Sequence, residues 1–143
     1  MKISQNLERV GDEATKIANR ARDLSQDPPL KIHLPIPHMA HLALDVLRTS
    51  LDAFVNSDPA AARAVIPRDK QVDRLNKDAY RQLAAAMVDE PDTISRCLHL
   101  MVVAKSLERI ADHAKNVAEE VVYLCQAEDI RHSAHLTSSS SSS

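Results

Sequence analysis

The chain has 143 residues, enough for one domain with a sizeable core. One glycine leaves almost nothing for Gly-rich phosphate loops or β-hairpins, and three aromatic residues with no tryptophan argue against base-stacking platforms. Eighteen basic residues against twenty acidic ones give a net charge of −2, so there is no electrostatic footprint for nucleic acid. Apolar residues at 44% and charged residues at 27% are typical of an all-α helical bundle.

The sequence also indicates where such a protein would work. It contains no apolar run long enough to span a membrane, and its first residues lack the apolar stretch of a signal peptide. Cys97 and Cys125 lie in separate stretches without a CxxC spacing. We therefore expect free thiols in a reducing compartment, which favours a cytoplasmic protein.

Prolines divide the first half of the chain into helices. A 3.6-residue apolar pattern predicts one helix over residues 3–25, which Pro28 and Pro29 follow. Two more prolines lie among residues 30–37, so this stretch should be an extended connector. A second helix is predicted over residues 37–56.

The second half should hold two longer helices. Asp58 is a good N-cap and Pro59 suits the first helical position, so a third helix should start there and reach Val88. Pro67 should kink that helix or split off its first two turns. The fourth helix should run over residues 92–127. The expected units are an orphan helix over 1–27, a Pro-rich connector over 28–36, a three-helix bundle over 37–133 and a disordered Ser-rich tail over 134–143.

An internal repeat is the most informative feature. Residues 7–14 match residues 107–114 at a constant offset of 100, and Ile17-Ala18 against Val117-Ala118 extends the match. Six of these aligned positions are identical, including a Leu-Glu-Arg triplet. Shared aliphatic positions would be unsurprising in any two bundle helices, but a shared Leu-Glu-Arg favours duplication.

Both copies of the repeat carry a pair of carboxylates. Glu8/Asp12 and Glu108/Asp112 are each spaced i, i+4, so each pair projects from one face of its helix. Two carboxylates at this spacing repel one another, and a bound hard cation would relieve the repulsion. Helical geometry places Glu108 and Asp112 away from the apolar arc of their helix, so ordinary solvated ion pairs are an equally open explanation.

A third pair adds weight to the metal hypothesis. Asp69 and Asp73 lie about 20 residues before the break at Pro91, and Glu108/Asp112 lie about 20 after it. If the third and fourth helices form an antiparallel hairpin, these four carboxylates meet at one level of the bundle. Without a cation such a cluster would be electrostatically poor. The lysines and arginines interleaved with the aspartates keep the solvated alternative open. His33, His38 and His41 are weaker metal candidates.

At this point the chain resembles a known family. Residues 107–124 are similar to the second signature helix of the PhoU family of phosphate-uptake regulators, and residues 7–18 to the first. Similarity also runs from Asp58 to Pro91 and includes residues 129–132. The resemblance covers nearly everything between residues 3 and 133.

The resemblance implies a fold and a site. Family members have two similar three-helix bundles, each with a Glu/Asp-x-x-x-Asp motif that binds iron, zinc or other divalent ions at the surface. Carried over to this sequence, the implied cofactors are divalent or trivalent metal ions, and their ligands are Glu8, Asp12, Asp69, Asp73, Glu108 and Asp112. Only four helices are expected here, so the first two helices of the family would be absent.

The resemblance also implies a function. Family members are cytoplasmic and usually dimeric. They repress phosphate-starvation genes by contacting the phosphate ABC transporter and a sensor histidine kinase, with at most peripheral membrane association and no catalytic turnover. Two alternatives remain open. One is a helical adaptor without metal, and the other is a di-metal carboxylate enzyme, although the Glu-x-x-His motif typical of such enzymes is absent from this sequence.

The first helix leads to a prediction about assembly. It carries an apolar stripe of Ile3, Leu7, Val10, Ile17 and Leu24, and its natural bundle partners are missing. Leaving each large side chain in water would forfeit about 1.5–3 kcal/mol. Folding back onto the bundle or packing against a second chain would cover the stripe. Because four prolines stiffen the connector, we expect a homodimer in which residues 3–26 of each chain contact the other.

Overall fold

The computed structural model describes the backbone of residues 2–140 and the side chains of residues 2–134. Throughout this range the regular structure is helical, which confirms the predicted all-α class. Two short 3₁₀ turns, η1 (Ile66–Arg68) and η2 (Pro91–Thr93), join consecutive helices. The helices are α1 (Lys2–Leu24), α2 (Ile36–Val55), α3 (Pro59–Val65), α4 (Asp69–Asp89) and α5 (Ile94–Ser140).

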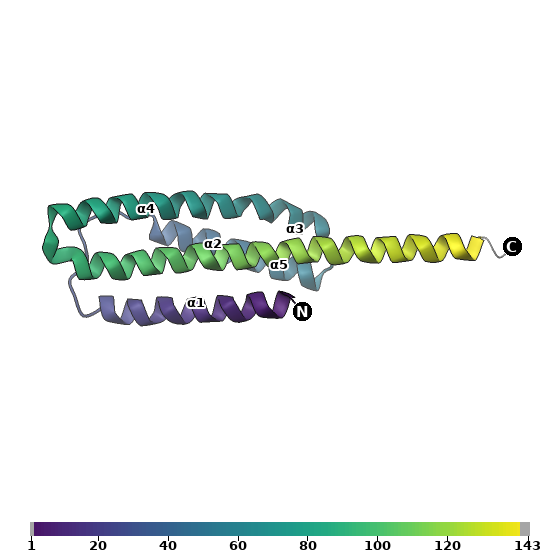
Figure 1. Ribbon diagram of the computed structural model, residues 1–143, viewed down its shortest axis with the longest axis horizontal. Coiled ribbons are helices and arrows are strands. Elements are labelled where there is room, and N and C mark those ends of the chain that lie inside the picture. The colour runs from purple at the N-terminus through teal and green to yellow at the C-terminus, as the bar shows by residue number, and fades with distance from the viewer. Residues whose placement is uncertain (1, 141–143) are drawn as a thin grey trace.

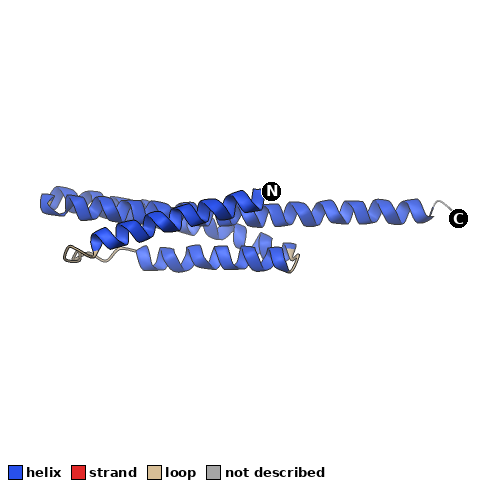
Figure 2. Cartoon of the chain, turned by 90° about the horizontal axis from the view of Figure 1, so that it is seen from below, coloured by secondary structure: helices blue, strands red, loops and turns tan. Residues whose placement is uncertain are grey.

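Helix α5 is the axis of the molecule (Figure 1). Helices α1, α2, α3 and α4 all pack against it. Helices α2, α4 and α5 form the predicted three-helix bundle, and α1 lies along another side of α5 (Figure 2). None of the described helices is long and apolar enough to cross a membrane.

The prolines act as the sequence predicted. Helix α3 begins at Pro59, and the Asp58 side chain accepts a hydrogen bond from the Ala61 amide at 3.1 Å. Pro67 lies in η1, which separates α3 from α4. Proline has no amide hydrogen to donate, so the α-helical hydrogen bonding is interrupted there. The expected split of the third helix is therefore confirmed.

The end of the chain differs from the prediction. Residues 134–143 were expected to form a disordered tail and the fourth helix to end at residue 127, but α5 continues through Ser140. Residues 141–143 lie outside the described range. No glycine or proline follows Pro91. Serine costs only a few tenths of a kcal/mol in a helix, so nothing in this stretch forces a stop. The last turns of α5 project beyond the bundle (Figure 1).

The core lies along one face of α5. Here small and medium side chains pack against α2, α3 and α4 with at most 7% exposure, and their spacing alternates between three and four residues. We call this face the α5 seam. Its members are Ala104, Leu107, Ala111, Ala114, Ala118 and Val121.

The face of α1 that corresponds to the α5 seam in the internal repeat is exposed and not buried. Ser4, Leu7, Gly11, Ala14, Ala18 and Ala21 occupy the positions 100 residues before the α5 seam, and all of them are exposed. We call this the α1 seam. Leu7, expected in the core stripe, is 37% exposed because it belongs to this seam rather than to the face that meets α5.

The other face of α1 packs within the chain, whereas the sequence analysis expected a second chain to cover it. Ile3 is buried, and Val10 and Ile17 pack against the core of the same chain. The stripe was expected to be covered by a second chain, but these residues are covered by α5 within one chain. The connector between Leu24 and Ile36 is long enough to allow the fold-back. With α1 folded back in this way, a contact with a second chain would use a different face of α1.

Candidate functional site

The carboxylates of α4 and α5 meet at one level of the bundle, as the hairpin geometry predicted. Asp69 and Asp112, from facing helices, both contact Lys115, with Nζ 3.6 Å from Asp69 Oδ2 and 3.2 Å from Asp112 Oδ1. One ammonium group therefore bridges the two helices. It lies where a cation would be expected to relieve their repulsion.

The pKa values in this cluster reflect both burial and the charges of its neighbours. The pKa of Asp69 is raised, chiefly by burial; Lys115 lowers it in part, and the nearby Asp112 and Asp73 carboxylates raise it further. Burial alone would lower the pKa of Lys115, but the hydrogen bond and charge of Asp112 and the charge of Asp69 outweigh burial and raise it. Lys115 therefore stays charged and neutralises part of the acidic cluster.

Glu108 and Asp73 have partners of their own. Asn76 on α4 donates a hydrogen bond to Glu108 Oε2 at 2.6 Å, and Lys105 Nζ lies 3.1 Å from Glu108 Oε1. Lys77 lies 3.7 Å from Asp73. Glu108 is only 19% exposed, whereas Asp73 is 44% and Asp112 50% exposed. All lie outside the dry core, as the helical geometry indicated.

The first acidic pair does not join this cluster. Glu8 and Asp12 are exposed on α1, and neither forms an ion pair with another described residue. Across the described residues, no three histidine, cysteine, aspartate or glutamate side chains are grouped so that they could hold a metal ion as placed. The spacing of three residues between Asp112 and Lys115 indicated that these two could pair, as they do, but sequence reasoning missed the contact of Lys115 with Asp69 on the facing helix.

A second polar cluster lies where the two repeat copies meet. Helices α1 and α5 run antiparallel: Asn6 contacts His113, with Oδ1 3.1 Å from Nδ1, and Arg20 contacts His99. The repeat relates Asn6 to Ser106 and Glu13 to His113. In turn, Ser106 and Glu13 are both buried, and the Ser106 hydroxyl helps to lower the pKa of Glu13. The two copies therefore meet about a local twofold axis.

Glu13 is the buried charge at this interface. Its exposure is 6%, and its Oε1 lies 3.2 Å from Lys16 Nζ and 3.6 Å from Arg109 Nη1. Burial alone would raise the pKa of Glu13, but the Ser106 hydroxyl and the two cations outweigh burial and lower it. Sequence reasoning missed Glu13. The signal was its position, since it follows Ile3 and Val10 on the face of α1 that meets α5.

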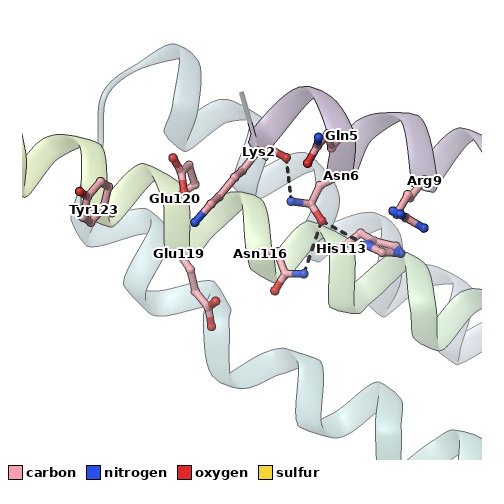
Figure 3. A pocket seen from close by; sticks show the side chains of 9 residues that line it. All are labelled: Lys2, Gln5, Asn6, Arg9, His113, Asn116, Glu119, Glu120 and Tyr123. Atoms are coloured by element: carbon pink, nitrogen blue, oxygen red, sulfur yellow. Dashed lines mark hydrogen bonds between the residues drawn. The ribbon is translucent and has the colours of Figure 1, made fainter.

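Beside this interface lies an open groove of about 1020 Å³ between the start of α1 and the middle of α5 (Figure 3). Asn6 lies at its centre, with its Oδ1 facing His113 Nδ1 and the Asn116 amide and its own amide donating to the Lys2 carbonyl. The rest of the lining mixes Lys2 and Arg9 with Glu119 and Glu120. This mixture of charges favours no single class of small ligand.

The lowered pKa of Glu13 predicts a pH-dependent contribution to stability. A carboxyl group that is more acidic in the folded state stabilises the fold above its unfolded pKa, and this contribution is lost as the pH falls through the folded value. We expect Glu13→Gln to lower the free energy of unfolding most at neutral pH. The difference from the parent should shrink as the pH falls below 4.5, the ordinary glutamate value. Urea titrations at several pH values measure it, and a difference that grows toward acid pH would contradict it.

Comparison with known proteins identifies the family. The PhoU domain model matches residues 36–121, which is more than half of the chain. The chain belongs to the PhoU family. The match spans α2 to α5 and includes the Asp69/Asp73 and Glu108/Asp112 pairs.

Curated relatives extend the similarity to α1. The phosphate-specific transport system accessory protein PhoU homolog of Pseudomonas putida is 41% identical over 128 residues, which cover 89% of this chain and 50% of the relative. The corresponding protein of Caulobacter vibrioides is 40% identical over 131 residues, covering 91% of this chain and 57% of the relative. The chain thus spans about half the length of the curated PhoU relatives it matches.

A solved PhoU structure has the same fold. The crystal structure of PhoU from Pseudomonas aeruginosa superposes with a TM-score of 0.84 at 39% sequence identity. The match covers 88% of this chain and 61% of that one. The arrangement of α1 against the three-helix bundle is therefore a PhoU arrangement.

Proposed function

We propose that this chain is an accessory regulator of phosphate transport that acts by binding other proteins and not by catalytic turnover. The observation that carries the proposal is the 41% identity over 128 residues to an accessory protein of a phosphate-specific transport system. The partners proposed are the phosphate ABC transporter and a sensor histidine kinase, both contacted from the cytoplasm. The proposed outcome is lower transport and repressed phosphate-starvation genes when phosphate is plentiful.

A reporter strain tests this function. Deleting the gene should raise expression from a phosphate-starvation promoter in phosphate-rich medium, and restoring the gene should lower it again. The Ala114→Glu variant, whose fold the buried charge should strongly destabilise, is the negative control and should lower expression less than the parent gene does. Expression that stays low after the deletion would contradict the proposal.

Metal binding is part of the proposal. The donor chemistry fits a hard cation, since Asp69, Asp73, Glu108 and Asp112 offer carboxylate oxygens from two facing helices. Glu8 and Asp12 would form the matching half-site on α1. Bound ions, iron or zinc among them, would neutralise this acidic surface. Lys115 opposes binding at the α4–α5 cluster, because its ammonium group already contacts Asp69 and Asp112. A metal-free adaptor, in which lysines alone balance the acids, is the alternative that this contact favours.

We also propose that the chain forms a homodimer through the α1 seam. Five seam positions, from Leu7 to Ala21, follow a spacing that alternates between four and three residues. Four of these five are glycine or alanine, which let two helices approach closely. In an antiparallel pair centred on Ala14, Leu7 of one chain would lie opposite Ala21 of the other. A large side chain would thus face a small one on both sides of the axis.

The Gly11→Leu variant distinguishes an effect on dimerisation from an effect on the stability of the single chain. A side-chain carbon added at Gly11 meets nothing within 4 Å in the single chain. Replacing a mid-helix glycine with a good helix former should raise the free energy of unfolding by about 0.5–1 kcal/mol. The leucine would nevertheless hold a partner helix away, so light scattering should show a weaker dimer. A variant that is both more stable and equally dimeric would place the interface elsewhere.

A further inference from the structure

The outer face of α4 carries a continuous row of positive charges. Lys70, Arg74, Lys77 and Arg81 follow one another at spacings of four, three and four residues. At 1.5 Å per residue the row is about 16 Å long. No other described helix has four cations in succession at this spacing. We call this row the α4 basic seam.

All four side chains face solvent. Each is exposed, and they lie opposite the buried stripe of Val72, Ala79 and Leu83 on the same helix. Only Lys77 forms an ion pair with a described residue, at 3.7 Å from Asp73. Helix α4 lies at the outer edge of the bundle (Figure 1), so no described helix covers this face. The seam is thus a charged surface without a partner in the chain.

The seam is narrow and has an apolar end. At 100° per residue, Asp73 and Asp78 lie about 70° from its centre, one on each side. The same alternating spacing continues beyond Arg81 through Ala84 to Val88, which is 81% exposed. The face therefore offers positive charge along most of its length and a short apolar end at Ala84 and Val88. Its heptad spacing is the spacing by which one helix packs along another.

We propose that the α4 basic seam binds an acidic amphipathic helix of another protein. Such a helix would present carboxylates to the four cations and apolar side chains to Ala84 and Val88. A flat anionic surface fits less well, because it would also meet the flanking carboxylates Asp73 and Asp78. A second copy of the chain does not supply the partner, since no described helix has three acidic residues in succession at this spacing.

A designed peptide tests the proposal directly. The probe is a fluorescein-labelled helical peptide with four glutamates at the spacing of the α4 basic seam and leucines at the next two positions on the same face. It is made in two versions, one with the leucines at the N-terminal end and one with them at the C-terminal end. Fluorescence anisotropy should show binding by one of the two. Arg74→Glu/Lys77→Glu should weaken it about tenfold or more, and a peptide with lysines at only the two facing positions should bind this variant more tightly than the original peptide does.

Matched controls distinguish binding of an acidic helix to the α4 basic seam from nonspecific charge attraction, membrane binding and self-association. Arg22→Glu/Arg48→Glu makes the same charge change at exposed positions on α1 and α2 and should leave the affinity within about twofold. A peptide of equal composition with the glutamates moved off one face should bind at least about tenfold more weakly. Equal binding of the probe and this control peptide would overturn the proposal. So would binding only to phosphatidylglycerol vesicles, or a seam variant that changes the self-association of the chain alone.

Discussion

Replacing Ala114 with glutamate should lower the free energy of unfolding by about 3–5 kcal/mol. Ala114 is 0% exposed in the α5 seam and packs in the apolar cluster that includes Val46 and Val65. The described members of this cluster are apolar and carry no cation to pair with a carboxylate, and the longer side chain has no room. Chemical denaturation followed by circular dichroism measures the loss.

The internal repeat provides a matched control for this substitution. Ala14 lies 100 residues earlier in the same sequence context, but it is exposed in the α1 seam. Ala14→Glu changes the same residue within a helix, so its effect on intrinsic helix propensity is the same. Measured at dilutions where the chain is monomeric, it should shift the free energy of unfolding by no more than about 0.5 kcal/mol, because Ala14 is covered only in the proposed dimer. Two variants that unfold at the same denaturant concentration would show that burial does not distinguish the two copies.

Replacing Lys115 with methionine should strengthen binding of divalent cations about tenfold. Methionine keeps much of the length of lysine but removes the ammonium group that contacts Asp69 and Asp112. The acidic cluster then loses its internal counter-charge, so an added Mn²⁺ ion no longer competes with the ammonium group for the carboxylates. Electron paramagnetic resonance of free Mn²⁺ during a titration measures the affinity.

Two further variants make the Lys115 experiment decisive. Lys31→Met removes a charge from the connector, far along the chain from the cluster, and should leave Mn²⁺ binding unchanged. Asp112→Ala should weaken it, because it removes a donor. If Lys115→Met and Lys31→Met bind Mn²⁺ as the parent does, the lysine does not compete with metal. If Asp112→Ala also has no effect, the site assignment is wrong.

Most of the fold could be predicted because its boundaries depend on local chemistry. Proline geometry and the Asp58 cap determine where α3 begins and where it separates from α4. The level at which Asp69 meets Asp112 followed from counting residues on either side of Pro91. The end of α5 could not be found in this way, because the serine-rich sequence carries no strong signal for or against a helix.

The site was harder to predict because it depends on which face of a helix is covered. Leu7 and Ile3 have the same apolar character, yet α5 covers only Ile3. A helix with apolar residues at two alternating series of positions does not itself indicate which series meets its neighbour. For the same reason Glu13 was not recognised as buried. The contact of Lys115 with Asp69 joins two helices, so periodicity along one helix cannot reveal it.

The antiparallel packing of α1 on α5 has a consequence for the order of folding. Asn6 and His113 are 107 residues apart, whereas α4 and α5 are joined by a single short turn. Short loops close at lower entropic cost, so the α4–α5 hairpin should form before α1 docks. During synthesis at 5–20 residues per second, α1 would wait roughly 5–20 s for its docking site to be made. During that interval both of its apolar faces are open, so nascent chains on neighbouring ribosomes could exchange α1 before either one has closed.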